Sequence, residues 1–390
     1  MKIYLVGGAI RDALLGIPVK DKDWLVVGSS SAELLRLGFL QVGKDFPVFL
    51  HPKTREEYAL ARTERKNGPG YRGFTVHTDQ RVTLEEDLAR RDLTVNAMAV
   101  PQEVAVDAAG EIKWDKALKN LIDPFGGQED LANRQLRHVT SAFAEDPIRI
   151  LRTARFAAQF EGFQVSNDTL EFMQTMVRTG EVTSLVSERV WQELAKGLMT
   201  KTPSRMVEVL HACGAWEHLL PELPISTTWT QIIDHSAQLN LPLASRWVSA
   251  VVAHEILLQN PPDFWTNVAD RLRWPKEIND LIILCIRERT SIQKSHAMNA
   301  EQLVSFFERC DALRKPTRFK QMLEIQKCIF NHQGCIPPTT IPMLLKGLDL
   351  VVKVSSHDIS QQALFEGKTG PEIGFMVRQA REEALRNFHH

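Results

Sequence analysis

The pattern of apolar and polar positions divides the chain into two parts. Up to about residue 130, short apolar runs of strand length alternate with turn residues and short helical segments. Residues 101–120 are weakly periodic, which predicts a surface hairpin or insertion. From about Glu145 onward, apolar residues recur at helical spacing, interrupted by Pro and Gly at intervals. The pattern therefore predicts an α+β N-terminal part and an all-α C-terminal half.

Several elements of the N-terminal part can be placed from the pattern. A short helix is expected over residues 9–16, and another begins at Thr83, because Thr83 and Glu86 have the spacing of a capping box. We expect Asp92 and Asn96 to lie on one face of a helix in this region. The predicted strands are residues 2–8 (KIYLVGG), 23–28 (DWLVVG), 46–52 (FPVFLHP) and 56–62 (EEYALAR).

Composition excludes several classes of protein. The chain has 390 residues, 44% of them hydrophobic, and a formal net charge of -1. A nucleic-acid partner would therefore meet local basic patches and not a global positive field. No apolar run is long enough to cross a bilayer, and the first residues do not resemble a signal peptide. The odd number of cysteines, 5, does not suggest a disulfide framework. We expect a cytoplasmic protein without a membrane partner.

Two aspartates at the start of a predicted strand give the first chemical signal. Because side chains alternate along a strand, Asp21 and Asp23 point to the same face. Neighbouring carboxylates repel each other unless a cation lies between them. Upstream, Gly7 and Gly8 with Arg11 form a backbone turn and a guanidinium group that suit a triphosphate. Paired carboxylates beside a phosphate site predict bound Mg2+.

A third carboxylate would complete a two-metal site of this kind. Glu57 is the best candidate because it lies on the alternating EEYALAR strand, with Glu56 on the opposite face. Each signal alone also has an ordinary explanation, since glycine pairs and D-x-D sequences often bind nothing. The joint pattern is more specific than any of its parts.

This joint pattern resembles a known family. LVGGAIRDALLG followed by DKDW is similar to the opening motif of nucleotidyltransferases related to DNA polymerase β. RRDLTVNAMA and EDPIRILRTARF are similar to class II tRNA nucleotidyltransferases and to the related bacterial poly(A) polymerases. The resemblance is strongest up to about residue 200, and closest to CCA-adding enzymes of gamma-proteobacterial type. It implies a polymerase-β-like head with a mixed sheet and helices (1–140), a helical neck with a nucleotide-base template (141–200), and a helical, tRNA-holding body and tail (201–390).

The resemblance also implies an activity. Such enzymes add C, C and A to the 3′ end of tRNA without a nucleic-acid template, using CTP and ATP with Mg2+ and releasing pyrophosphate. It makes Asp21 and Asp23 the expected metal ligands and, with Glu57, the catalytic residues. A poly(A) polymerase, an enzyme that adds only C or only A, and an inactive RNA-binding protein remain alternatives. The sequence leaves open whether the protein is a monomer or a homodimer.

The motif RRDLTVNAMA implies contacts to the sugar and the phosphates. Arg91 matches the triphosphate contact, and Asp92 and Asn96 match the ribose contacts. The alternative is an exposed, charge-rich helix start. We favour the ribose role because Asn inside a helix competes with the backbone for hydrogen bonds.

The motif EDPIRILRTARF implies an amino-acid template for the base. Asp146 and Arg149 lie three residues apart and are expected side by side on a helix. C and A present an amino donor next to a ring acceptor, whereas G and U present an N–H there, so one Asp–Arg pair can select the first two. Arg152 is expected to meet the nucleotide, while Arg155 lies farther round the helix and fits a salt bridge equally well. The candidate site residues are therefore Gly8, Arg11, Asp21, Asp23, Glu57, Arg91, Asp92, Asn96, Asp146, Arg149, Arg152 and Arg155.

Two further regions bear on the resemblance. ERKNGPGYRGF, residues 64–74, resembles the flexible loop that permits the switch from adding C to adding A, although it also fits a plain mobile loop. Many relatives carry a C-terminal phosphohydrolase (HD) domain with a metal-binding His-Asp pair. Here His235 and His254 remain, but the pair reads His254-Glu255. We therefore expect a degenerate HD-like domain that keeps its helices without its chemistry, its histidines being ordinary core residues.

Overall fold

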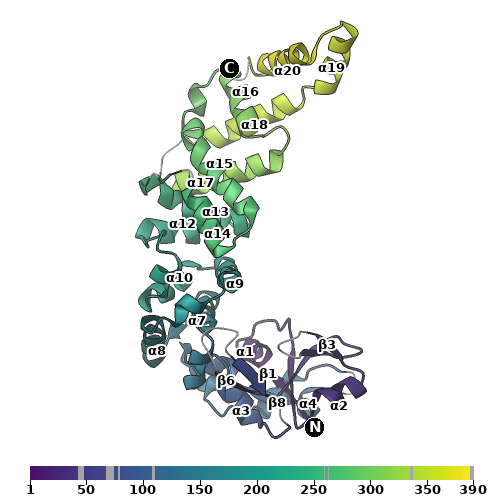
Figure 1. Cartoon of the computed structure of the whole chain (residues 1–390), viewed down its shortest axis with the longest axis vertical. Helices are drawn as coiled ribbons and strands as arrows, with labels where there is room; N and C mark the ends of the chain where they lie inside the picture. Colours follow the sequence, from purple (N-terminus) through teal and green to yellow (C-terminus); the bar gives the residue numbers. More distant parts are fainter. Residues whose placement is uncertain are drawn as a thin grey trace. The chain divides into compact units, whose positions relative to one another are not determined.

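The computed structural model describes residues 1–42, 48–66, 74–77, 80–107, 110–258, 260–261, 263–333 and 337–386. The chain forms two compact units, Met1–Pro221 and Glu222–His390 (Figure 1). Within the described residues, no helix is both long enough and apolar enough to cross a membrane.

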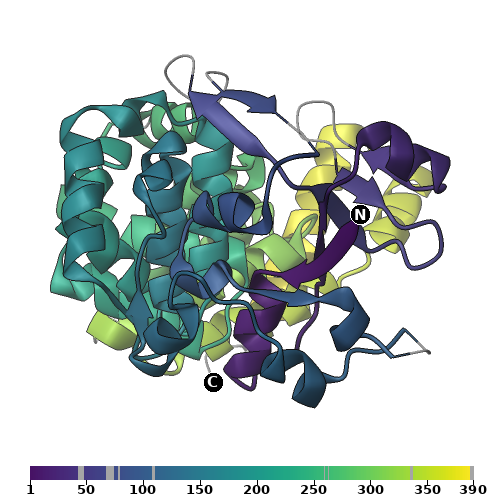
Figure 2. The same cartoon turned by 90° about the horizontal axis from the view of Figure 1, so that it is seen from below.

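A six-stranded mixed sheet organises the first unit. Its strand order is β3-β4-β5-β2-β1-β8; β2 and β5 run parallel, and the other neighbours are antiparallel. Figure 2 shows β1 leading directly into the short helix α1. These elements are β1 (Lys2–Val6), α1 (Gly8–Leu14), β2 (Asp23–Val27), α2 (Ser31–Arg36), β3 (Leu40–Val42), β4 (Val48–Leu50), β5 (Glu57–Leu60) and β8 (Ala99–Pro101). The expected mixed sheet with helices is confirmed.

The four predicted strands are present as β1, β2, β4 and β5, although the first two residues of the third prediction lie outside the described part of the chain. The pattern missed β3 and β8, which have only three residues each. A run of three residues is too short to establish alternation by itself. In β3 the apolar pattern is also weak, because Leu40 leaves 54% of its surface exposed.

The register between β2 and β5 separates two chemically different faces. Asp23 is paired with Glu57, and Trp24 with Tyr58. The rings of Trp24 and Tyr58 stack with their centroids 5.8 Å apart, and Nε1 of Trp24 donates to Glu56 at 3.0 Å. Because side chains alternate along each strand, the acidic pair and the aromatic pair lie on opposite faces.

The helix predicted at Thr83 is shorter than expected. It is α3 (Leu84–Ala89), and the capping box between Thr83 and Glu86 is present. The expectation that Asp92 and Asn96 share a helix face is wrong, because α3 ends before them and only a 3₁₀ turn, Thr94–Asn96, follows. The carboxylate of Asp92 accepts the backbone N–H of Leu93 at 2.9 Å, a local bond that competes with helix formation.

The hairpin expected at residues 101–120 is also wrong in part. A single bridge joins Val106 to Ile112, and short helices lie on both sides of it, α4 (Gln102–Ala105) and α5 (Trp114–Lys119). Helices this short give too few turns for a clear period of 3.6 residues.

The remainder of the chain is helical, as predicted. The first unit continues with α6 (Gly127–Ala132), the two-residue strands β9 (Gln135–Leu136) and β10 (Gln164–Val165), α7 (Ile148–Gln159), α8 (Asn167–Arg178), α9 (Ser187–Leu198), α10 (Ser204–Ala212) and α11 (Ala215–Leu219). Helices α7 and α9 pack against each other, and both contribute polar residues to the site described below.

Strands β6 (Thr63–Lys66) and β7 (Phe74–His77) pair antiparallel in a separate two-stranded sheet.

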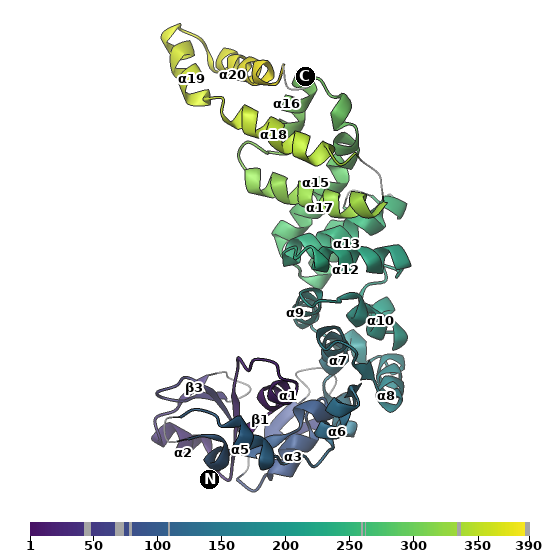
Figure 3. The same ribbon diagram turned by 180° about the vertical axis from the view of Figure 1, so that it is seen from behind.

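The second unit consists of helices (Figure 3). These are α12 (Thr227–Gln238), α13 (Leu243–Leu258), α14 (Phe264–Leu272), α15 (Lys276–Gln293), α16 (Ala300–Arg309), α17 (Pro316–Gln333), α18 (Thr340–Val352), α19 (Ser356–Phe365) and α20 (Gly370–Leu385). His235 lies on α12 and His254, which is buried, on α13. In the described ranges, no group of three or more His, Cys, Asp or Glu residues is placed to hold a metal ion.

Candidate functional site

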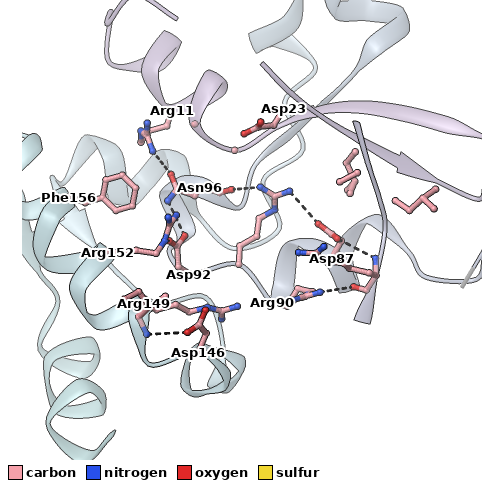
Figure 4. A pocket seen from close by; sticks show the side chains of 18 of the residues that line it. Arg11, Asp23, Asp87, Arg90, Asp92, Asn96, Asp146, Arg149, Arg152 and Phe156 are labelled. Atoms are coloured by element: carbon pink, nitrogen blue, oxygen red, sulfur yellow. Dashed lines mark hydrogen bonds and ion pairs between the residues drawn. The ribbon is translucent and has the colours of Figure 1, made fainter. Parts of the chain in front are cut away.

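One pocket of the first unit collects most of the predicted site residues (Figure 4). Its volume is about 490 Å³, and strands β2 and β5, helices α1, α3, α7 and α9 and the segment after α3 contribute to its walls. Of the predicted residues, all of which the structure describes, Asp21, Glu57 and Arg155 do not line it. Those that do are Gly8, Arg11, Asp23, Arg91, Asp92, Asn96, Asp146, Arg149 and Arg152.

The turn after β1 brings two guanidinium groups close to the main chain. Gly7 has a φ of 74°, a left-handed conformation that favours glycine. A Cβ at Gly7 would lie 2.9 Å from Nη1 of Arg91, and a Cβ at Gly8 would lie 3.3 Å from Nη2 of Arg11. The absence of side chains at this turn is therefore what lets both arginines approach the backbone.

Arg11 is held by aromatic rings and an amide. Its side chain is buried, and its Cζ lies 5.1 Å from the ring centroid of Phe156 and 4.9 Å from that of Phe160. The two rings stack on each other along α7, with centroids 5.7 Å apart. Nη1 of Arg11 donates to Oδ1 of Asn96 at 2.6 Å. Cation–π contacts and a charged hydrogen bond thus fix a cation beside the pocket.

Asp92 joins the segment after α3 to α7. Its Oδ1 accepts the N–H of Leu93 at 2.9 Å and Nδ2 of Asn96 at 3.0 Å, and its Oδ2 accepts Nε of Arg152 at 2.7 Å. Burial alone would raise the pKa of Asp92, but the charge of Arg152 and the hydrogen bonds from Asn96 and Arg152 outweigh burial and hold that pKa well below its usual range. Asp92 is therefore ionised, and its charge is balanced inside the protein.

Of the acidic residues that begin β2 and β5, only Asp23 lines this pocket. Asp23 is exposed, but partial desolvation by its surroundings, the largest effect, raises its pKa; Arg91 lowers that pKa and Asp21 raises it again. The two aspartates are therefore close enough to repel each other. Glu57 is in register with Asp23, but the described residues contain no group of three acidic side chains gathered as a metal site. In the described part of the chain, at most two carboxylates are thus placed to share one ion here.

The expectation that Asp146 and Arg149 share a helix is wrong, because α7 begins at Ile148 and Asp146 lies just before it. Arg189 of α9 donates to Asp146 from both nitrogens, Nη2 to Oδ2 at 2.7 Å and Nη1 to Oδ1 at 3.2 Å. Arg149 is buried, which lowers its pKa, and its Nη1 donates to the carbonyl of Ala142 at 2.8 Å. All three charged side chains line the pocket. The residue that contacts Asp146 is therefore one that the sequence did not indicate.

Comparisons with known proteins identify the family of this chain. Family models match residues 3–137, as the poly(A) polymerase head domain, and residues 162–225, as a probable RNA and SrmB-binding site of polymerase A. A multifunctional CCA protein of Paracidovorax citrulli (strain AAC00-1) is 45% identical over 423 residues, covering 100% of this chain and 98% of its own. This chain belongs to the multifunctional CCA protein family. The resemblance indicated by the sequence motifs is thus confirmed.

Solved structures show the same fold. A Thermotoga maritima CCA-adding enzyme complexed with tRNA has a TM-score of 0.66 at 22% identity, over 99% of this chain and 87% of that one. A CCA-adding enzyme in complex with CTP has a TM-score of 0.67 at 22% identity, with the same coverage. The α+β head followed by helices is therefore the fold of CCA-adding enzymes.

The salt bridge that the spacing left open for Arg155 is present in this member of the CCA protein family. Nε of Arg155 donates to Glu193 of α9 at 2.6 Å, and Nη1 of Arg155 donates to Gln159 at 3.0 Å. Its Cζ lies 4.2 Å from the ring centroid of Phe156. Arg155 therefore ties α7 to α9, while Arg152, three residues earlier, lines the pocket.

The loop predicted at residues 64–74 is wrong at both ends, because residues 64–66 belong to β6 and Phe74 to β7. Residues 67–73 lie outside the described residues.

The sequence also missed several pocket residues. Arg90 could have been found as the neighbour of Arg91 in RRD, whereas nothing in the local pattern marks the others. The charged and aromatic pocket residues that the sequence missed are Arg62, Asp87, Arg90, Phe156 and Arg189.

Proposed function

We propose that this chain adds C, C and A in turn to the 3′ end of tRNA, using CTP and ATP. The tRNA 3′ oxygen bonds to the α-phosphorus of the nucleotide, the bond from that phosphorus to the bridging oxygen breaks, and pyrophosphate leaves. One observation carries the proposal: Asp23, the cations Arg11 and Arg91, and the base-reading candidate Asp146 line a single pocket. The names of the relatives and of the solved structures, which include tRNA and CTP complexes, support the same reaction.

The cations near the Gly7–Gly8 turn suit the triphosphate. Arg11 and Arg91 approach the backbone there, and Gly8 and Asp23 line the same pocket. A guanidinium group binds phosphate oxygens through planar, charged hydrogen bonds. We assign Arg11, Arg91 and the Gly8 backbone to the phosphates.

We assign the sugar to residues of the segment after α3, and the base to residues on α7 and just before it. We assign the ribose to Asp92 and Asn96, whose mutual hydrogen bond of 3.0 Å fixes both side chains. We assign the base edge to Asp146 and Arg149, with Arg152 beside them. An aspartate can accept from the amino group of C or A, and a guanidinium can donate to the neighbouring ring acceptor. U and G do not satisfy both groups, which leaves buried polar atoms unpaired.

The residues present fit Mg2+. Asp21 and Asp23 are hard oxygen ligands that repel each other, and Mg2+ in phosphate sites is commonly held by one or two carboxylates, with substrate phosphates and water as the other ligands. Glu57, in register with Asp23, adds negative charge to the same face. Mg2+ bound there would activate the tRNA 3′ hydroxyl and neutralise the departing pyrophosphate.

We keep the division into head (1–140), neck (141–200) and tRNA-holding body and tail (201–390). The neck contains Asp146 and α7, on which Arg149 and Arg152 lie. For the second unit we propose binding of tRNA without hydrolysis, because His254 is followed by Glu255 and not by Asp. We place the protein in the cytoplasm, a reducing compartment, in keeping with the free thiols of Cys213, Cys285, Cys310 and Cys328.

The deciding experiment follows incorporation one nucleotide at a time. Three tRNA transcripts, ending before CCA, after C and after CC, are incubated with Mg2+ and CTP, ATP or both. We expect C, C and a single A, followed by a stop.

Other outcomes would replace the proposal with a specific alternative. A long ladder of A on unfolded RNA would identify a poly(A) polymerase. C without A, or A only on the transcript ending in CC, would identify a split-activity enzyme. No incorporation would leave an RNA-binding protein.

A further inference from the structure

Arg189 holds the carboxylate of Asp146 in a fork. The two hydrogen bonds, 2.7 Å from Nη2 to Oδ2 and 3.2 Å from Nη1 to Oδ1, join residues 43 positions apart in the sequence. Both residues line the pocket, Asp146 just before α7 and Arg189 in the first turn of α9. Two parallel bonds from a planar guanidinium fix the plane of a carboxylate as well as its position.

The hydrogen bonds of Asp146 leave one acceptor position open. A carboxylate has about four lone-pair positions for hydrogen bonds. Arg189 takes one on each oxygen, and the backbone N–H of Ile148 takes the second one on Oδ1 at 3.2 Å. The position that remains is on Oδ2. Nη1 of Arg149 donates instead to the carbonyl of Ala142, and among the described residues no side-chain hydrogen bond joins Arg149 to Asp146.

We infer that Arg189 is a specificity-determining positioning residue. The inference rests on the proposed function, in which Asp146 reads the base edge. The fork directs the open lone pair of Oδ2 toward the amino group of C or A. U and G carry a carbonyl oxygen where C and A carry that amino group, and two acceptors facing each other repel. A carboxylate that could rotate would relieve this repulsion, and the fork of Arg189 prevents the rotation.

A merely structural role for the ion pair leads to a different expectation. The side chains of Arg189 and Asp146 are 28% and 25% exposed. Ion pairs this accessible to solvent contribute little to stability. If Arg189 only joined α9 to α7, its loss would change the rate with all nucleotides alike. A change in the ratio between correct and incorrect nucleotides is specific to positioning.

The test measures kcat/KM of the full chain for CTP and UTP on tRNA ending before CCA, and for ATP and GTP on tRNA ending in CC. The variants are Arg189→Gln, Arg189→Lys and, as a matched control, Arg205→Gln. Arg205 also makes a 2.7 Å ion pair, with Glu208, and is 31% exposed, but it does not line the pocket.

We expect Arg189→Gln to lower the CTP/UTP and ATP/GTP ratios by about tenfold or more, the effect of one misdirected hydrogen bond. Arg189→Lys keeps the charge but loses the two parallel hydrogen bonds. Its CTP/UTP and ATP/GTP ratios should lie between those of Arg189→Gln and those of the wild type. Arg205→Gln should keep the wild-type ratios.

Failure of this inference can be told apart from failure of the proposed function. A wild-type protein that adds neither C nor A overturns the proposed function itself. If the wild type adds C, C and A while Arg189→Gln keeps its ratios, or slows all four nucleotides equally, the role assigned to Arg189 is wrong. Thermal unfolding checks that each variant is folded. Should Arg189→Gln not fold, Arg189→Lys decides, because an unchanged ratio in that variant also overturns the inference.

Discussion

Nε of Arg152 donates a 2.7 Å hydrogen bond to the carboxylate of Asp92, 60 residues away in the sequence. The bond fastens α7 to the segment after α3. Asn96 extends the connection, since its Nδ2 donates to Asp92 at 3.0 Å and its Oδ1 accepts Nη1 of Arg11 at 2.6 Å. These four side chains form a continuous chain from α1 to α7. Changing one of them should therefore affect the pocket beyond its own position.

Acid should weaken the fold through Asp92. Its pKa in the folded protein is below the ordinary value of 3.8, so its stabilising contribution is fully present above about pH 4 and is lost as the pH falls toward the folded pKa. We expect Asp92→Asn to lower the free energy of unfolding at pH 7 by about 1–2 kcal/mol, because it removes the buried member of an ion pair whose other member, Arg152, is 36% exposed. The difference should shrink below pH 4. Urea unfolding of both proteins at pH 7, 5, 4 and 3 measures it, and a difference that stayed constant down to pH 3 would contradict an ionised Asp92.

Arg152 and Arg155 should differ in their effect on nucleotide binding, although each pairs with a buried carboxylate. Arg152 lines the pocket, whereas Arg155 and its partner Glu193 are only 13% and 8% exposed. We expect Arg152→Gln to raise the KM for CTP and ATP by about tenfold, through loss of a charged hydrogen bond. Arg155→Gln should lower the free energy of unfolding by about 2 kcal/mol, because it leaves the buried carboxylate of Glu193 with only Lys196, at 3.5 Å, as a charged partner. Nucleotide titrations and urea unfolding of both variants test this. A larger rise in KM for Arg155→Gln than for Arg152→Gln would place Arg155 at the nucleotide instead.

Features that depend on local backbone geometry could be predicted from the sequence. Alternation along β2 and β5 put Asp23 and Glu57 on one face and Glu56 on the other, which the strand register bears out. The capping box at Thr83 marked the start of α3 for the same reason. The end of α3 was mispredicted, because the hydrogen bond from Leu93 to the side chain of Asp92 leaves no trace in the hydrophobic period.

Contacts between residues distant in sequence could not be predicted. The three-residue spacing predicted Asp146 and Arg149 side by side on one helix, but Asp146 lies just before α7, and Nη1 of Arg149 donates to the carbonyl of Ala142. The actual partner, Arg189, lies on another helix, and its distance from Asp146 is set by the packing of α9 on α7. Local periodicity contains no information on that packing.

Gly127 should be needed for a close approach to Thr94. A Cβ at Gly127 would lie 2.4 Å from the carbonyl oxygen of Thr94, in the 3₁₀ turn that carries Asn96. We expect Gly127→Ala to lower the free energy of unfolding by about 2–3 kcal/mol through overpacking, and to raise the KM for nucleotides by moving Asn96.

Gly374 provides the matched control for this substitution. It is an exposed residue inside α20, and a Cβ there would meet nothing within 4 Å. Gly374→Ala should raise the free energy of unfolding by about 0.5–1 kcal/mol, because alanine favours the helix. Urea unfolding compares the two variants. Equal effects of both substitutions would show that the backbone near Thr94 yields easily.

The two faces at the start of β2 predict opposite consequences for two carboxylates. Asp23 lines the pocket, whereas Glu56, on the other face, accepts Nε1 of Trp24 at 3.0 Å and pairs with Lys22 at 3.2 Å. We expect Asp23→Asn to lower kcat for C addition at saturating CTP by at least about 100-fold, since it removes charge at the reacting phosphate. Glu56→Gln should keep kcat within about twofold, because it alters only a partly exposed ion pair. Single-turnover incorporation measures both, and circular dichroism verifies the fold. Wild-type kcat in Asp23→Asn would remove Asp23 from the reaction, and an equal loss in both variants would point to damage of the strand instead of lost chemistry.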